Sequence, residues 1–345
     1  MHSLIFQLVQ YPMKINILFF VLISTVILCA NPVSHKKHSH RKHKEIFPAW
    51  VIKKDLVVKS NLSPRNGLIN ALINKLEAKE GIGERVTKKE FLSLFNRPES
   101  KLVYKDKLVK YATPKSMAIQ KAEHDTYTQS LLQENKINEG VSFLSRNYSF
   151  LDKAEHKYGV CKQDIVSILM WESGLGKYTG SCRVFNIFMA QILFLDAAQK
   201  YELRKIFKIE GVNPLANSHF RELEMTRINH RKRDAVEGLA SLLRFCKENK
   251  LDPLSQTGSW GGAIGYVQFM PFSLNYAVDA DSNGTIDLNN WPDAIYSVAN
   301  YLKLKGNYSK DANGRRTAFF QYNHSDEYAN GVMLYADSIS KRFKL

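Results

Sequence analysis

A single glutamate stands out as a residue that could perform acid–base chemistry. Ile165, Ile168 and Leu169 form the apolar face of a predicted helix, and Glu172 takes the next position on that face. Burying an ionised carboxylate is costly, so burial raises its pKa and retains its proton near neutral pH. A general acid that protonates a glycosidic oxygen needs this state. The alternative is a structural Glu172, paired with an arginine or hydrogen-bonded inside the core.

A glycine-rich stretch downstream could line a ligand groove. Residues 258–271 read Gly-Ser-Trp-Gly-Gly-Ala-Ile-Gly-Tyr-Val-Gln-Phe-Met-Pro. No Gly-Lys-Ser/Thr follows, so a phosphate loop is excluded. The alternative is a packing loop whose glycines let helices approach closely. The candidate hydrogen-bond donors are Ser259 and Gln268, and the candidate faces for sugar rings are Trp260, Tyr266 and Phe269.

A third polar segment, Tyr322-Asn-His-Ser325, precedes a predicted helix over 328–342. Asn323 could bind a ligand there. It could equally cap the helix, because asparagine is a favoured N-cap residue.

An acidic loop over 279–293 has the start of a calcium-binding pattern. Oxygen ligands are available at positions 1, 3 and 5, glycine stands at position 6, and a backbone carbonyl is available at position 7. Asn290 stands where the pattern has a glutamate, and Asp293 is the next acid. We expect a lengthened EF-hand-like loop with a structural Ca²⁺, against the alternative of a polar turn without metal. The expected ligands are Asp279, Asp281, Asn283, Thr285 and Asp293.

The elements that carry these residues are predominantly helical, and few strand signals are present. Thr87 and Glu90 have the spacing of a capping box that opens a helix. The expected fold class is mostly α. Helical apolar spacing recurs over 66–79, 137–158, 163–173, 184–208, 234–249, 292–304 and 328–342. The chemistry-bearing residues therefore lie on helix ends and on the loops between helices.

In their order and spacing, the glutamate, the glycine-rich stretch and the Tyr-Asn-His-Ser segment resemble the membrane-bound B-type lytic murein transglycosylases. The resemblance spans roughly 66–342 and includes the acidic loop with its late Asp293. It implies a lysozyme-like catalytic core over 136–345, with an N-terminal helical region over 49–135. It also implies peptidoglycan glycan strands as the substrate and no organic cofactor.

The resemblance assigns Glu172 as the sole catalytic acid/base. Glu172 would protonate the oxygen between N-acetylmuramic acid and N-acetylglucosamine, with the substrate's own N-acetyl group assisting. It would then take the proton of the C6 hydroxyl, which closes a 1,6-anhydro ring without consuming water. The residues that match substrate-groove positions are Tyr127, Ser259, Gln268, Tyr301, Tyr322, Asn323 and Tyr328.

Two departures from the family pattern concern the groove. Family members with three domains insert a β-rich domain, but only 303–321 separates the flanking motifs here, so we expect that domain to be missing. An arginine pair of some relatives is replaced by Ala197-Ala-Gln-Lys-Tyr201, which puts recognition of the peptide stem in doubt.

The N-terminal residues predict export. Residues 1–30 have the basic and apolar regions of a secretory signal, and Cys29 is a candidate for lipidation and membrane anchoring, although Leu28 is unusual before such a cysteine. Residues 31–48 form a basic His/Lys-rich segment, either a tether or a metal-binding tract. The net charge of +16 suits an anionic cell wall or membrane, and export argues against nucleic acid. We expect a location in the bacterial cell envelope, in the periplasm or as an outer-membrane lipoprotein.

Cys161 and Cys182 bracket the helix and loop that carry Glu172. They could form a disulfide in an oxidising compartment, and three free cysteines with Cys246 are the alternative.

Two other functions remain open at this point. A lysozyme-type hydrolase would use the same glutamate with water as acceptor and would need a second carboxylate, for which Asp196 and Glu202 are nearest in sequence. A non-catalytic, calcium-stabilised cell-wall-binding protein would have no need of a buried acid.

Overall fold

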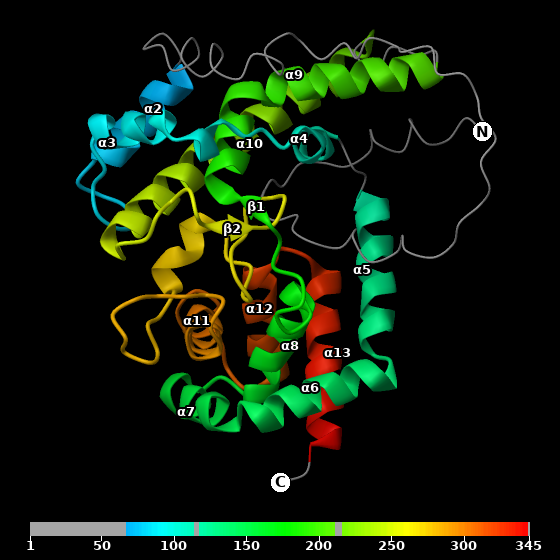
Figure 1. Cartoon of the computed structure of the whole chain (residues 1–345). Helices are drawn as coiled ribbons and strands as arrows, with labels where there is room; N and C mark the ends of the chain where they lie inside the picture. The colour runs from blue at the N-terminus through cyan, green and yellow to red at the C-terminus, as the bar shows by residue number, and fades with distance from the viewer. Residues whose placement is uncertain (1–66, 114–116, 211–215, 344–345) are drawn as a thin grey trace, which may run out of the picture.

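The computed structural model of the protein describes residues 67–113, 117–210 and 216–343, and these are predominantly helical (Figure 1). The predicted export signal over 1–30, its Cys29 and the basic segment over 31–48 lie outside these residues. In the part of the chain that is described, no helix is both long enough and apolar enough to cross a membrane.

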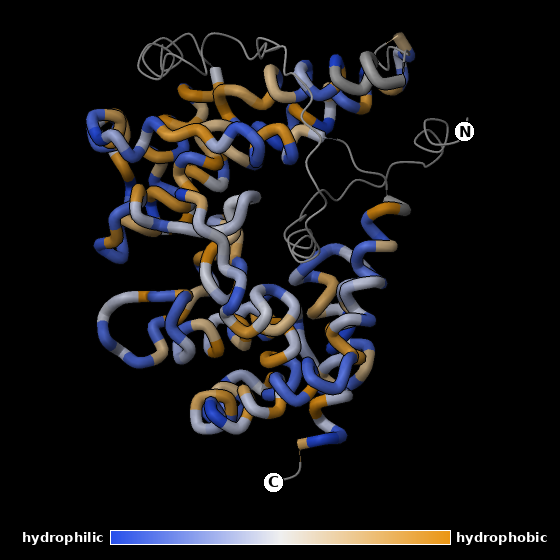
Figure 2. The backbone as a smooth tube through the Cα atoms, turned by 45° about the vertical axis from the view of Figure 1, so that its right-hand side comes forward, coloured by the Kyte–Doolittle hydropathy of each residue, from blue (hydrophilic) through white to orange (hydrophobic). Residues whose placement is uncertain are grey.

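Five α-helices form an upper layer in which α9 and α10 pack against each other, α4 against α9, and α2 against α10 (Figure 1). Hydrophobic and hydrophilic residues alternate along this layer (Figure 2). Thr87 and Glu90 form the predicted capping box: each side chain accepts the other's backbone N–H. The helices are α2 (Gly67–Glu77), α3 (Lys88–Ser93), α4 (Lys105–Ala112), α9 (Val184–Glu210) and α10 (Ser218–Glu248), with the 3₁₀ turns η3 (Leu94–Asn96) and η4 (Pro98–Lys101).

The remaining helices form a lower group around α8, with α5 packed along α13 (Figure 1). They are α5 (Met117–Leu131), α6 (Glu134–Arg146), α7 (Tyr148–Tyr158), α8 (Lys162–Ser173), α11 (Trp291–Leu304), α12 (Ala312–Tyr322) and α13 (Asp326–Arg342). The helix predicted over 137–158 is two helices, because the chain leaves helical geometry at Asn147, whose side chain donates to the carbonyl of Phe143.

The central helix α8 is buried on every side from Asp164 to Ser173. The apolar face seen in the sequence is therefore only part of its contact surface. The hydroxyl of Ser167 donates to the carbonyl of Val332 on α13. At its N-terminal end, Arg315 of α12 binds both carboxylate oxygens of Asp164. These polar contacts fix α8 against the two helices that carry the Tyr-Asn-His-Ser segment.

A two-stranded antiparallel sheet lies between the upper layer and the lower group (Figure 1). It pairs β1 (Cys182–Arg183) with β2 (Thr257–Gly258), so the loop after α8 meets the start of the glycine-rich stretch. Cys182, Cys161 and Cys246 are free cysteines.

The interval where a β-rich domain was expected to be missing contains a short turn and then α12. This helix connects α11 to α13 directly. The short 3₁₀ helix η6 (Pro271–Tyr276) continues the glycine-rich stretch toward the acidic loop.

Candidate active site

Glu172 lies in the last turn of α8, where the helix ends beside a cavity. Gly174 ends the helix in the left-handed conformation at φ 58°, which glycine adopts without steric penalty. The Glu172 side chain is 7% exposed. It borders a cavity, together with Gln268, Phe269, Met270, Ser273, Tyr301, Tyr322 and Asn323. The structure thus brings together Glu172 and four of the seven residues expected in the groove.

Within the described part of the chain, the carboxyl group of Glu172 has a hydrogen-bond donor but no cationic side chain beside it. The hydroxyl of Tyr328 on α13 donates to Glu172 Oε1 at 2.7 Å. Burial raises the pKa of Glu172 to about 8, although the hydrogen bond from Tyr328 lowers it in part. Within the described residues no ion pair reaches Glu172, so the arginine-paired alternative is wrong. Burial without a neighbouring cation favours the protonated form of this carboxyl group.

Two further tyrosines line the cavity, and their hydroxyl groups donate hydrogen bonds to backbone carbonyls. Tyr301 donates to the carbonyl of Gln321 at 2.8 Å, and Tyr322 donates to that of Val267 at 2.6 Å. Their rings meet edge to face at 4.9 Å. Burial raises the pKa of both phenols above the usual range, so the rings stay neutral. A neutral, ring-lined wall accounts for the unfavourable environment of a charged Glu172.

Gln268 is held in a strained turn beside Glu172. Its φ is +49°, and the turn is closed by reciprocal backbone hydrogen bonds between Ile264 and Phe269. Its side-chain nitrogen donates to the carbonyls of Thr179 and Gly265, while its Oε1 is buried with no partner in the described structure. Gln268 therefore has a spare acceptor, whereas the sequence suggested a donor.

Three residues expected in the groove do not border the cavity. Ser259 accepts the N–H groups of Gly261 and Ala263 and so shapes the glycine-rich loop. Tyr127 on α5 donates to the carbonyl of Trp171 at 3.3 Å. Tyr328 lies behind Glu172 as its hydrogen-bond donor.

The three aromatic rings that were expected to face sugars lie in different environments. Phe269 borders the cavity, but Tyr266 stacks on Trp291 at 3.9 Å. Trp260 contacts Tyr111, and Lys110 lies over its ring. Met270 and Ser273 border the cavity and were missed, although they lie in or beside the stretch that the sequence singled out.

Asn323 ends α12 and borders the cavity. It does not cap the following helix. Ser325 does so, accepting the N–H of Tyr328 at 3.2 Å.

Among the residues that the structure describes, Glu172 is the one acid that borders the cavity. Asp196, a candidate partner in sequence, lies on α9 and pairs with Lys232 of α10. Glu202, the other candidate, is also on α9 and does not border the cavity.

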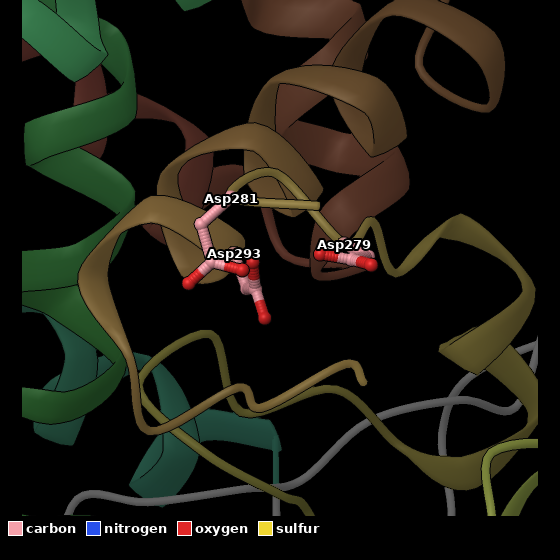
Figure 3. A group of neighbouring side chains, drawn as sticks. All are labelled: Asp279, Asp281 and Asp293. Carbon is pink, nitrogen blue, oxygen red and sulfur yellow. The ribbon is translucent and has the colours of Figure 1, made fainter. Parts of the chain in front are cut away.

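The acidic loop gathers three carboxylates, with oxygen atoms within 4.8 Å of one another, from Asp279, Asp281 and Asp293 (Figure 3). Asp293, which is fully buried, accepts the N–H groups of Ala280 and Asp287 at 2.8 Å each. Its late position therefore closes the lengthened loop. An all-oxygen, multiply charged donor set suits a hard cation such as Ca²⁺.

The acidic loop also supports the turn that carries Gln268. The N–H of Tyr266 donates to the carbonyl of Leu288 at 2.8 Å. Gly265 packs so closely on Leu288 that a Cβ would lie 2.4 Å from that residue's own Cβ. The two sites are therefore mechanically connected through 264–269.

Comparison with known proteins gives one family. Residues 69–319 match the transglycosylase SLT domain. Over 237 residues, the chain is 30% identical to membrane-bound lytic murein transglycosylase B of Escherichia coli (strain K12); the match covers 68% of this chain and 56% of that protein.

Solved structures agree on the fold. Soluble lytic transglycosylase SltB1 of Pseudomonas aeruginosa has a TM-score of 0.57 at 22% identity, covering 74% of this chain and 94% of that one. Escherichia coli lytic transglycosylase Slt35, solved in complex with calcium, also has a TM-score of 0.57, at 20% identity, covering 81% and 94%. The family match over most of the chain confirms the resemblance found in the sequence, and this chain belongs to the transglycosylase SLT domain family.

Proposed function

We propose that this protein is a lytic transglycosylase that cleaves peptidoglycan glycan strands between N-acetylmuramic acid and N-acetylglucosamine. One observation carries the proposal: a cavity bordered by a single carboxyl group, Glu172, whose pKa burial raises to about 8. Membership of the transglycosylase family supports the same activity.

In the first step, Glu172 donates its proton to the glycosidic oxygen while the bond to the sugar carbon breaks. Burial keeps the acid protonated at neutral pH, and the hydrogen bond from Tyr328 supports the carboxylate that forms. Glycosidases with two protein carboxylates place the second one as nucleophile or base. The cavity has no such residue, so the acetamido oxygen of the muramoyl unit takes that place.

In the second step, the carboxylate of Glu172 accepts the proton of the C6 hydroxyl. The C6 oxygen then bonds to the anomeric carbon and displaces the acetamido oxygen, which gives a 1,6-anhydro sugar. The proton lost by Glu172 in the first step is regained, and no water is consumed. The spare Oε1 of Gln268 and the side chain of Asn323 border the space for the reacting sugar and would orient it.

We further propose that the acidic loop is an EF-hand-like calcium site. Asp279, Asp281, Asn283 and Asp293 would supply side-chain oxygens, and Thr285 its backbone carbonyl. Bound calcium would neutralise the clustered carboxylates and stabilise the loop that supports 264–269. The role is structural.

Digestion of purified sacculi by the wild type and by Glu172→Gln, followed by mass spectrometry of the muropeptides, tests the activity. The proposal predicts anhydro products from the wild type and none from the variant. Hydrated products, one water heavier, would instead identify a lysozyme-type hydrolase. A folded wild type that binds sacculi but releases nothing would identify a binding protein.

A further inference from the structure

An exposed aromatic ring lies near the catalytic cavity and has no part in the mechanism above. Tyr178 follows α8 on the segment that leads to β1, and it is 50% exposed. The only other aromatic side chain among the prominently exposed hydrophobic residues of the described structure is Phe150 on α7. Because this ring is exposed and lies close in the chain to Glu172, it is a candidate for contact with a ligand.

The backbone around Tyr178 is fixed on both sides. Its N–H donates to the carbonyl of Ser173 at 2.9 Å, which holds it against the end of α8. The preceding Lys177 pairs with Glu139 of α6 at 2.8 Å. The following Thr179 accepts from the side chain of Gln268, which borders the cavity. The ring is therefore presented by a rigid turn, so little conformational entropy is lost when a ligand stacks on it.

The Tyr178 ring itself lies against the helix end. A Cβ on Gly174 would be 2.9 Å from its Cδ2 atom. Ser173 and Gly174, which the backbone and ring of Tyr178 contact, directly follow Glu172 in the chain. The exposed ring is thus part of the same rim as the catalytic acid.

We propose that Tyr178 is a carbohydrate-stacking residue that binds a saccharide unit of the glycan strand adjacent to the unit in the cavity. The inference rests on the proposed function. A glycan strand has many sugar units and only the unit beside Glu172 reacts in the cavity, so the strand must continue outside it. A phenol ring with an apolar face and a polar edge suits the apolar face and hydroxyl rim of a hexopyranose.

Binding of glycan fragments of two lengths tests this proposal. The full chain carrying Glu172→Gln is titrated calorimetrically with N-acetylmuramic acid alone and with the hexasaccharide of alternating N-acetylglucosamine and N-acetylmuramic acid. Adding Tyr178→Ala should weaken hexasaccharide binding about fivefold, the size of one aromatic contact, and leave binding of the single sugar unchanged. Tyr178→Phe should retain the affinity because it keeps the ring.

Two further variants separate stacking from support of the turn. Tyr178→Leu keeps bulk against Gly174 without a ring and should lose hexasaccharide affinity as the alanine variant does. Phe150→Ala removes an exposed ring from α7, which contributes nothing to the cavity, and should bind both fragments normally.

Unchanged hexasaccharide affinity in Tyr178→Ala, or an equal loss for both fragments, would overturn the inference. Either result leaves the proposed function intact provided that the wild type makes anhydro products. If the wild type makes none and neither fragment binds, the proposed function fails and this inference fails with it.

Discussion

The cavity beside Glu172 and the acidic loop use the same functional group in opposite electrostatic environments. In the cavity, one carboxyl group stands alone among tyrosines and amides, and burial keeps it protonated. In the loop, three carboxylates crowd within 4.8 Å of one another, and two of them are partly or fully exposed. An isolated buried carboxyl group lowers its energy by keeping a proton, whereas a crowded set of carboxylates does so by binding a cation. The number and solvation of the carboxyl groups, rather than their residue type, therefore favour a proton donor in the cavity and cation ligands in the loop.

Asp293 is intermediate between the two environments. Burial raises its pKa, as does the charge of Asp281 and Asp279, while the N–H groups of Asp287 and Ala280 lower it. The two backbone donors keep its oxygen atoms directed into the loop even without a cation.

Removing the lone acid should have the largest effect. We expect Glu172→Gln to lower the rate of sacculus digestion about 10³-fold or more, because a general acid contributes about 10²–10⁴-fold and no other acid borders the cavity. Asp196→Asn is the matched control on the surface pair with Lys232 and should digest sacculi at the wild-type rate. A large loss in Asp196→Asn would favour a hydrolase with two carboxylates.

The same substitution should stabilise the protein at high pH. The pKa of Glu172 is above its unfolded value, so its contribution to stability is present at acidic pH and is lost as the pH rises toward about 8. Urea unfolding should therefore show Glu172→Gln and wild type nearly equal at pH 4, and the variant more stable at pH 9 by on the order of 3–5 kcal/mol.

Glu155 provides a comparison in which the pKa shift has the opposite sign. Burial alone would raise its pKa, but hydrogen bonds from Lys162 and Lys310 lower it overall. Glu155→Gln should therefore destabilise the protein at neutral pH, and the difference should shrink below pH 4. A pH-independent difference for Glu172→Gln would contradict the assignment of a buried, protonated acid.

Calcium should stabilise the wild type by binding the three crowded carboxylates of the acidic loop. At a calcium concentration 100 times the Kd, we expect about 2.7 kcal/mol of added stability, measured as a rise in Tm that EDTA reverses. Asp281→Asn should lose this rise, whereas Glu172→Gln should keep it in full. An unchanged response in Asp281→Asn would remove this carboxylate from the site.

Removing the hydrogen bond from Tyr328 to Glu172 should have the smallest effect. In Tyr328→Phe the carboxylate of Glu172 loses its donor, so the pKa should rise by about one unit. The alkaline limb of the pH–activity profile should move up by the same amount. Tyr301→Phe is the control, because its hydroxyl group donates to Gln321 and should leave that limb in place.

The sequence predicted the parts of the site that depend on local spacing. Glu172 follows from the helical period of the residues before it. The capping box at Thr87 and the gathering of Asp279, Asp281 and Asp293 also follow from short-range patterns. In each case the partners are close along the chain, so local geometry decides the outcome.

Features that depend on contacts between residues far apart in the sequence could not be predicted from local spacing. Tyr266 and Trp260 looked like sugar-binding faces, but Trp291 and Tyr111 occupy their rings. Ser259 looked like a donor to substrate, but the loop folds back onto it. Helix α5 was missed because its apolar residues form no strong stripe.

The most direct test of the central claim is a ¹³C NMR titration of the Glu172 carboxyl group, in protein labelled at glutamate and assigned by comparison with Glu172→Gln. The structure predicts a midpoint at about pH 8, well separated from the other glutamates, because burial disfavours the charged form. A midpoint near 4, the value of an exposed glutamate, would contradict the claim that Glu172 carries its proton at neutral pH and acts as the acid.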